Sequence, residues 1–169
     1  NSGTESTMDA IHLARGATGR DLVLKIEGSY HGHHDAVMVS VRPPLDQLGE
    51  RGAPASVPFG SGHPHAVSEL TKAIPFNDLE VLERVLDDIG DQVAALILEP
   101  AMMNITIVAP RPGYLDGVRE LTARHGVVLV FDEVKTGATI AAGGAVERFG
   151  VQPDVVCLAK AIAGGYPSG

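Results

Sequence analysis

Three charged residues stand at the ends of apolar runs, and their side chains suit chemistry on amines. Glu99 ends "VAALILE", Asp132 follows "VVLVF" and Lys160 ends "DVVCLAK". A lysine amine forms Schiff bases with carbonyl compounds, and a carboxylate can keep a ring nitrogen protonated. The alternative interpretation is that each charge only marks the point where a strand leaves the core.

The segment "NSGTES" at the start of the chain adds a candidate phosphate site. Ser2, Gly3 and Thr4 precede a helical pattern and would offer backbone N–H groups and hydroxyls at a helix N-terminus. The competing interpretation is a capping box of Ser2 with Glu5, which only begins the helix. A lysine, an aspartate and a phosphate site are the groups that hold pyridoxal phosphate in proteins, so together they suggest this cofactor.

The segment "YHGHHD" places Tyr30 beside a group of histidines, residues 31, 33 and 34. Histidine is a common metal ligand, so a metal-dependent hydrolase using this histidine cluster is an alternative function of another class. Adjacent histidines on a loop need further ligands in a defined geometry, and His63 and His65 lie in a long loop that offers this poorly. We therefore expect no metal site.

The candidate residues lie in a pattern of alternating strands and helices. The sequence predicts strands at 22–27, 93–99, 127–133 and 154–160, and helices at 4–15, 78–89 and 114–125. Gly16 is expected to end the first helix, and Asn77 with Glu80 to begin the second as a capping box. Residues 42–65 are expected to form one long loop.

Strands that are apolar on both faces and alternate with helices indicate a parallel sheet covered on both sides. The predicted fold class is therefore α/β, a three-layer sandwich with a mainly parallel sheet. The carboxyl ends of parallel strands meet along one edge, where ligands bind. Glu99, Asp132 and Lys160 should therefore lie close together.

Composition excludes several classes of partner. The formal net charge is −8, which argues against binding to nucleic acid or to an anionic membrane surface. No apolar run approaches the roughly 20 residues that span a bilayer. Cys157 is the only cysteine, so no disulfide forms within the chain, and we expect a cytoplasmic location.

Six motifs together resemble one family: "NSGTE", "YHGHHD", "PFNDLE", "EPAMMN", "FDEVKTG" and "LAKAIAGGYPSG". In order and separation they resemble the class III, fold type I pyridoxal-phosphate aminotransferases over essentially the whole chain. The resemblance is strongest to the glutamate-1-semialdehyde aminomutase group and to the β-amino-acid and amine transaminases. It implies that residues 1–169 are the central part of the cofactor-binding large domain, without the N-terminal segment and the C-terminal small domain.

The resemblance also implies roles for individual residues around the cofactor ring. Lys160 matches the Schiff-base lysine, and Asp132 matches the aspartate that pairs with the pyridine nitrogen. Val134 and Tyr30 match the residues against the two faces of the ring. These four positions would hold and activate pyridoxal 5′-phosphate.

Further matches concern the edges of the cofactor. Asn104 is similar to the residue that hydrogen-bonds the phenolic oxygen in the aminomutase group, and Glu99 to a glutamate near the ring. His31 is expected to support the site by hydrogen bonds. The phosphate cup of the family matches the first residues of the chain: Ser2, Gly3 and Thr4.

The implied function is transfer of an amino group between an amino acid or amine, β-amino acids included, and a keto acid. The alternative within the family is the aminomutase, an intramolecular amino shift that makes a tetrapyrrole precursor. After "DEV" the aminomutase group usually continues Met-Thr-Gly-Phe-Arg, whereas this chain has Lys135 and no arginine, and "MNITIVAP" is closer to the β-amino-acid transaminases.

The family also implies a homodimer whose partner completes the phosphate site. If the molecule ended at Gly169, we would expect little or no turnover.

Overall fold

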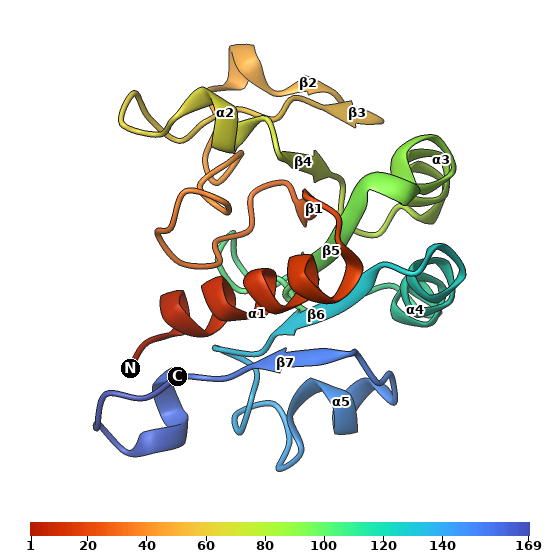
Figure 1. Cartoon of the computed structure of the whole chain (residues 1–169). Helices are drawn as coiled ribbons and strands as arrows, with labels where there is room; N and C mark the ends of the chain where they lie inside the picture. The colour runs from red at the N-terminus through yellow and green to blue at the C-terminus, as the bar shows by residue number, and fades with distance from the viewer.

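The centre of the molecule is a parallel sheet, as predicted. The computed structural model describes all 169 residues. Five strands follow the order β4-β1-β5-β6-β7, and each neighbouring pair is parallel (Figure 1). Their bounds in chain order are Leu22–Ile26 (β1), Thr71–Ile74 (β4), Val93–Leu98 (β5), Val128–Asp132 (β6) and Val155–Cys157 (β7).

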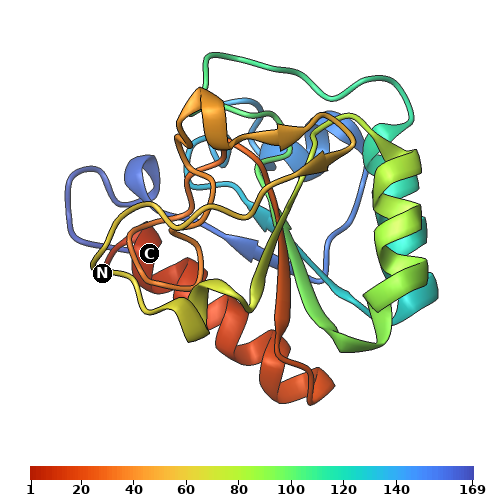
Figure 2. The same cartoon turned by 90° about the horizontal axis from the view of Figure 1, so that it is seen from above.

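Helices cover both faces of this sheet and make the three expected layers. Helix α1 (Gly3–Thr18) lies on one face, while α3 (Leu79–Ile89) and α4 (Tyr114–His125) lie on the other (Figure 2). The short α5 (Gly144–Phe149) packs partly buried apolar residues against the same cluster as α3 and α4. The prediction of an α/β three-layer sandwich is confirmed.

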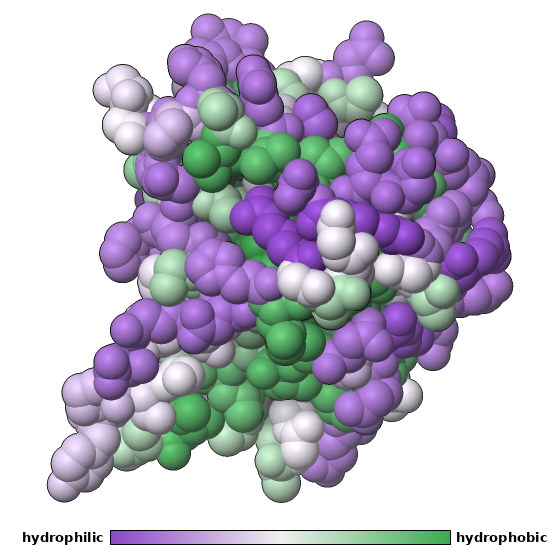
Figure 3. Space-filling model, viewed as in Figure 1, coloured by the Kyte–Doolittle hydropathy of each residue, from purple (hydrophilic) through white to green (hydrophobic).

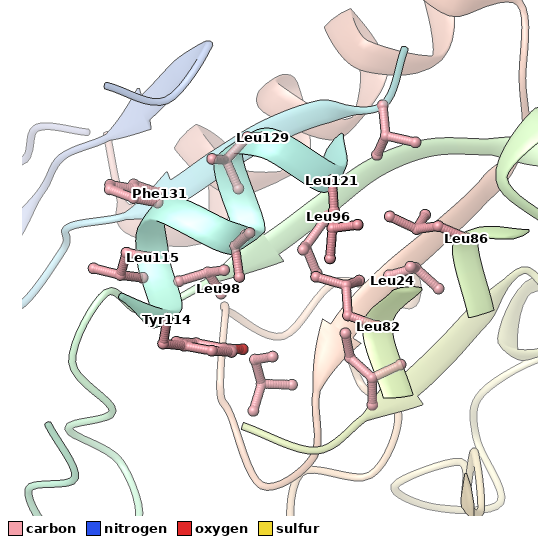
Figure 4. Packing of buried hydrophobic residues seen from close by; sticks show 14 of the residues in the cluster. Leu24, Leu82, Leu86, Leu96, Leu98, Tyr114, Leu115, Leu121, Leu129 and Phe131 are labelled. Atoms are coloured by element: carbon pink, nitrogen blue, oxygen red, sulfur yellow. The ribbon is translucent and has the colours of Figure 1, made fainter. Parts of the chain in front are cut away.

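Two apolar clusters hold the layers together because the sheet is buried on both sides. All six residues of β5 are buried. The larger cluster joins the sheet to α3 and α4 with 17 buried residues, among them Leu82, Leu96 and Phe131 (Figure 4). The smaller cluster of 12 buried residues joins the other face to Ala10, Ile11 and other residues of α1.

The surface is mostly polar, with scattered apolar side chains. Polar residues cover much of the face seen in Figure 3, and apolar residues show between them. Several large apolar side chains are well exposed, including Leu45, Phe59 and Ile107. None of the helices has the length and apolar character required to cross a membrane.

Two helix boundaries differ from the prediction. Helix α1 continues through Gly16 to Thr18 and is capped by Gly19, whose φ of 68° is left-handed, the conformation that a helix C-terminus takes up most easily at glycine. Helix α3 is capped at its start by Asp78, whose side chain accepts a hydrogen bond from the Val81 N–H at 3.1 Å. Asn77 instead bonds the 109–111 segment, so the predicted capping box of Asn77 with Glu80 was wrong.

The remaining corrections concern short elements. The strand predicted at 154–160 ends at Cys157, and Lys160 begins a 3-10 helix, η3 (Lys160–Ala163). The expected loop at 42–65 contains η1 (Leu45–Gln47) and an antiparallel pair, β2 (Gly49–Glu50) and β3 (Ala53–Pro54). Strand β4, helix α5, helix α2 (His65–Ser68) and the 3-10 helix η2 (Gly90–Gln92) were not predicted.

Candidate active site

The carboxyl edge of the sheet forms a cavity that gathers the predicted residues. Glu99 directly follows β5, Asp132 ends β6, and Lys160 lies three residues beyond β7. The cavity has a volume of about 170 Å³. Its lining consists of Gly3, Thr4, Tyr30, His31, Gly32, Glu99, Asn104, Asp132, Val134, Lys135 and Lys160. Among the residues expected at the cofactor, Ser2 alone does not line it.

Asp132 and His31 form a buried pair at the end of β6. His31 Nδ1 lies 2.7 Å from Asp132 Oδ2, and both side chains are almost fully excluded from solvent. The other oxygen, Asp132 Oδ1, accepts a hydrogen bond from the Val134 N–H at 3.0 Å. These contacts fix the carboxylate in position and leave His31 Nε2 buried without a partner.

Glu99 is a second buried acid on the same edge. Its Oε2 accepts a hydrogen bond from the Met103 N–H at 2.9 Å, whereas its Oε1 is buried and has no partner. Burial raises the pKa of Glu99, because desolvation disfavours the charged carboxylate. Glu99 can therefore keep a proton at a pH where an exposed glutamate has lost it.

Lys160 reaches the cavity from an unusual backbone conformation. Its φ is 53°, a left-handed conformation that costs free energy for a residue other than glycine. It lines the cavity although it lies past the end of β7. Residues in sparsely populated conformations concentrate at functional sites, which is consistent with a chemical role for this lysine.

The N-terminus of α1 supplies both the capping box and part of the cavity wall. Ser2 Oγ accepts a hydrogen bond from the Glu5 N–H and donates one to the Glu5 carboxylate, which is the alternative weighed from the sequence. Gly3 and Thr4 still face the cavity. The helix start thus combines a structural cap with backbone N–H groups near the cavity.

Two glycines allow the walls of the cavity to approach closely. A Cβ at Gly3 would lie 2.9 Å from Val134 Cγ2, and a Cβ at Gly32 would lie 2.8 Å from Thr4 Cα. Gly32 also has a φ of 101°, which side chains rarely tolerate. The segment carrying Tyr30 and His31 can therefore lie directly against the start of α1.

Tyr30, Val134 and Asn104 contribute the rest of the lining. Tyr30 is 39% exposed, whereas Val134 is buried. The Asn104 amide donates to the Tyr30 carbonyl at 3.3 Å. A second hollow shares Tyr30 and Asn104 with the cavity and continues toward Met38, Val41, Arg42 and Phe59.

The other histidines do not meet around a common point. Nowhere in the chain do three or more histidine, cysteine, aspartate or glutamate side chains come together in a way that could hold a metal ion. His34 Nε2 lies 3.4 Å from the Thr7 hydroxyl, and burial lowers the pKa of His34 to about 4. His63 pairs with Asp35 near the surface.

Lys135 lines the cavity but was not among the predicted site residues. The sequence offered one signal, namely that lysine replaces the methionine usual in the aminomutase group. Its Nζ donates to Asn104 Oδ1 at 2.6 Å and to the Met103 carbonyl at 3.1 Å. Both partners are distant in sequence, so the pattern alone did not reveal the contact.

Comparison with known proteins agrees with this geometry. The family described as aminotransferase class-III matches residues 1–169. Glutamate-1-semialdehyde 2,1-aminomutases from Natranaerobius thermophilus and Syntrophobacter fumaroxidans are 45% and 48% identical over the whole chain. An omega-transaminase from Sphaerobacter thermophilus superposes with a TM-score of 0.92 at 38% identity, over 99% of this chain and 38% of its own.

The chain spans 38% and 37% of the length of the two aminomutases. The family match nevertheless extends from the first residue to the last, and it covers every residue that lines the cavity. The chain therefore belongs to the class III aminotransferases, a family of pyridoxal-phosphate-dependent enzymes.

Proposed function

We propose that this chain carries the cofactor site of an aminotransferase that moves an amino group between an amino acid or amine, β-amino acids included, and a keto acid. The observation that carries the proposal is the meeting of Lys160, Asp132 and His31 around one cavity at the carboxyl edge of the sheet. When bound, pyridoxal phosphate supplies a carbonyl carbon that takes up amino groups and a ring that withdraws electrons from the substrate.

The cavity has features that fit such a cofactor. Two buried polar atoms, His31 Nε2 and Glu99 Oε1, have no partner within the chain, and burying such atoms unpaired costs free energy. Gly3 and Thr4, the first residues of α1, line the cavity, and the start of a helix favours a phosphate. A polar, anionic ligand would therefore find hydrogen-bond partners both at the buried side chains of His31 and Glu99 and at the start of α1.

The residues that line the cavity would each hold or activate one part of the cofactor. Lys160 supplies the amine that would hold the cofactor covalently and then move a proton. Asp132, held by His31 and the Val134 N–H, would keep the ring nitrogen protonated. Val134 and Tyr30 would lie against the two faces of the ring, and Gly3 and Thr4 with Ser2 would hold the phosphate.

Assembly is also part of the proposal. Since the chain spans less than two fifths of the curated relatives, residues 1–169 would be the central part of the large domain. Further segments and a second subunit would then complete the phosphate site and the substrate pocket. Donor and acceptor are proposed to be small molecules, and the cytoplasmic location stays a prediction.

The aminomutase is the second candidate, and the identity to two aminomutases favours it. The segment after "FDEV" points the other way, because Lys135 and the missing arginine depart from that group. Mixing the enzyme with an amino donor and a separate keto acid distinguishes the two. A transaminase releases its keto product between half-reactions, whereas a mutase retains the amino group on one substrate.

The absorption spectrum of the purified full-length protein tests the cofactor and the lysine together. We expect a visible band that changes when an amine donor is added, and we expect Lys160→Ala to lose the lysine Schiff-base character of that band and the amino transfer. Lys72→Ala is the matched control, because Lys72 is exposed on β4 away from the cavity. No visible band after incubation with pyridoxal phosphate would contradict the proposal.

A further inference from the structure

Lys135 is the one cavity-lining cation that the proposed reaction leaves without a role. It is half-buried, and it follows Val134 directly. Its Nζ lies 2.6 Å from Asn104 Oδ1 and 3.1 Å from the Met103 carbonyl oxygen. Lys135 is thus bonded to the segment that follows β5.

The chemistry of the two groups decides which end of the Asn104 amide faces Lys135. An ammonium group has three N–H donors and no acceptor, while the amide has an oxygen acceptor at one end and an NH₂ donor at the other. Only the oxygen can therefore face Lys135, because the reverse orientation would bring two donors together. The charge on Lys135 also strengthens the bond to Oδ1.

The other end of the amide is fixed as a consequence. Asn104 Nδ2 donates one N–H to the Tyr30 carbonyl at 3.3 Å. Asn104 lines the cavity beside Glu99, and a hydrogen bond from its amide partly offsets the rise in the Glu99 pKa, so the N–H end of the amide faces the side of the cavity that a ligand would share with Glu99. A cavity wall that presents a donor selects an acceptor oxygen on that side of the ligand.

We propose that Lys135 is a positioning residue that holds the Asn104 amide with its N–H donors toward Tyr30 and the cavity. The inference rests on the proposed function, because the ligand acceptor would be the phenolic oxygen of the cofactor that Lys160 would hold. Without Lys135 only the Tyr30 carbonyl would hold the amide, so the amide would rotate more readily and its oxygen would at times face the phenolic oxygen, which would replace an attraction by a repulsion.

A merely electrostatic role for Lys135 is the competing explanation. Lys135 lines the cavity, and its positive charge would act directly on a charged ligand there regardless of Asn104. The two explanations differ in whether the effect of Lys135 passes through Asn104. A double-mutant cycle measures that dependence directly.

The test is a pH titration of the visible absorption band in the full-length protein with pyridoxal phosphate bound. Lys135→Met removes the donors and the charge at similar length. The visible band would follow the proton on the Schiff base of Lys160. Its titration midpoint should rise by about one pH unit, a tenfold change in proton affinity, because losing a donor at the phenolic oxygen would leave more negative charge beside that proton. Lys135→Arg should return most of the shift, and Lys72→Met, the same change on the exposed β4, should cause none.

The cycle with Asn104→Ala decides the inference. We expect Lys135→Met to shift the midpoint by less than a third as much when Asn104 is already alanine. An equal shift in both backgrounds, or none in the wild-type background, would overturn the positioning role. These outcomes differ from failure of the proposed function, in which the wild-type protein would show no visible band at all.

Discussion

The α3–α4 face of the sheet and the carboxyl edge of the same sheet are built by opposite rules. The face buries 17 side chains that are almost entirely apolar. The edge buries Glu99 and Asp132 at the ends of β5 and β6, and His31 on the segment that follows β1. Apolar burial stabilises the fold directly, whereas buried ionisable groups cost free energy unless they are paired.

The pairing at the edge is incomplete. His31 Nε2 and Glu99 Oε1 are buried without partners, although Asp132 is bonded at both oxygens. Apolar packing explains the α3–α4 face except for the Tyr114 hydroxyl, which is also buried without a partner, but it does not explain two such atoms that line one cavity. The comparison therefore assigns stability chiefly to the face and ligand binding to the edge, and substitutions in each region can test that division.

The largest effect is expected at the edge, from Asp132→Asn. The substitution keeps the shape and the acceptor for the Val134 N–H but removes the negative charge. Amino transfer should fall by roughly 10²–10⁴-fold, the usual contribution of a group that controls a proton. Single-turnover kinetics of the full-length protein measure this fall.

The control is Asp21→Asn, the same loss of charge at an exposed residue before β1. It should leave the rate unchanged. A rate for Asp132→Asn within a few-fold of wild type would show that the charge on Asp132 is not needed for the reaction. The assignment of the chemistry to the carboxyl edge would then be wrong.

The α3–α4 face should respond to Leu82→Ala with lost stability. Leu82 is fully buried in the larger cluster, so the cavity left behind should lower the free energy of unfolding by about 2–5 kcal/mol. Urea unfolding measures the change, and Leu13→Ala on the exposed side of α1 is the matched control, with at most about 0.5 kcal/mol. Loss of the cofactor band in the folded Leu82→Ala protein would mean that the two regions are coupled.

The sequence was sufficient to predict the convergence at the edge, because long apolar runs that alternate with helices leave few arrangements of a sheet. It was insufficient where short segments depend on tertiary contacts. Strand β4 has only four residues, Thr71–Ile74, and its position depends on pairing with β1. Asn77 and Asp78 both suit a helix start, and bonds from Asn77 to the 109–111 segment leave Asp78 as the cap.

The same limit applies to the site. The residue types at Asp132 and Lys160 indicated their chemistry, and strand order brought them together. The contact between Lys135 and Asn104 joins residues 31 positions apart, so no local pattern could reveal it. The left-handed backbone at Lys160 likewise depends on how the chain leaves β7 rather than on the residue itself.

Lys25 belongs to the buried sheet but also supports the carboxyl edge. It lies in β1 and is fully buried, yet its Nζ donates to the carbonyl oxygens of Ser29 at 3.0 Å and Val39 at 2.6 Å. These two carbonyls bracket the segment that carries Tyr30 and His31. A buried amine in the sheet thus holds a wall of the cavity in place.

The titration of Lys25 gives the smallest effect and a defined sign. Burial lowers the pKa of Lys25 to about 7, although the charges of Glu99 and Glu27 partly oppose the shift. Above pH 7 the folded chain has released this proton, while the unfolded chain keeps it up to the ordinary pKa near 10.5. The unfolded state then binds more protons, so the free energy of unfolding should rise with pH, by roughly 1 kcal/mol between pH 7 and 8.

Comparison of wild type with Lys25→Met isolates this slope. Urea unfolding of both proteins at pH 6, 7 and 8 cancels the groups they share, among them Cys157, whose pKa burial raises to about 12. The difference between the two should change little from pH 6 to 7 and grow from pH 7 to 8, because Lys25 is protonated in both states of the wild type at the lower pH. Parallel curves over the whole range would mean that Lys25 stays charged in the fold, and that the carbonyls of Ser29 and Val39 hold an ammonium group rather than an amine.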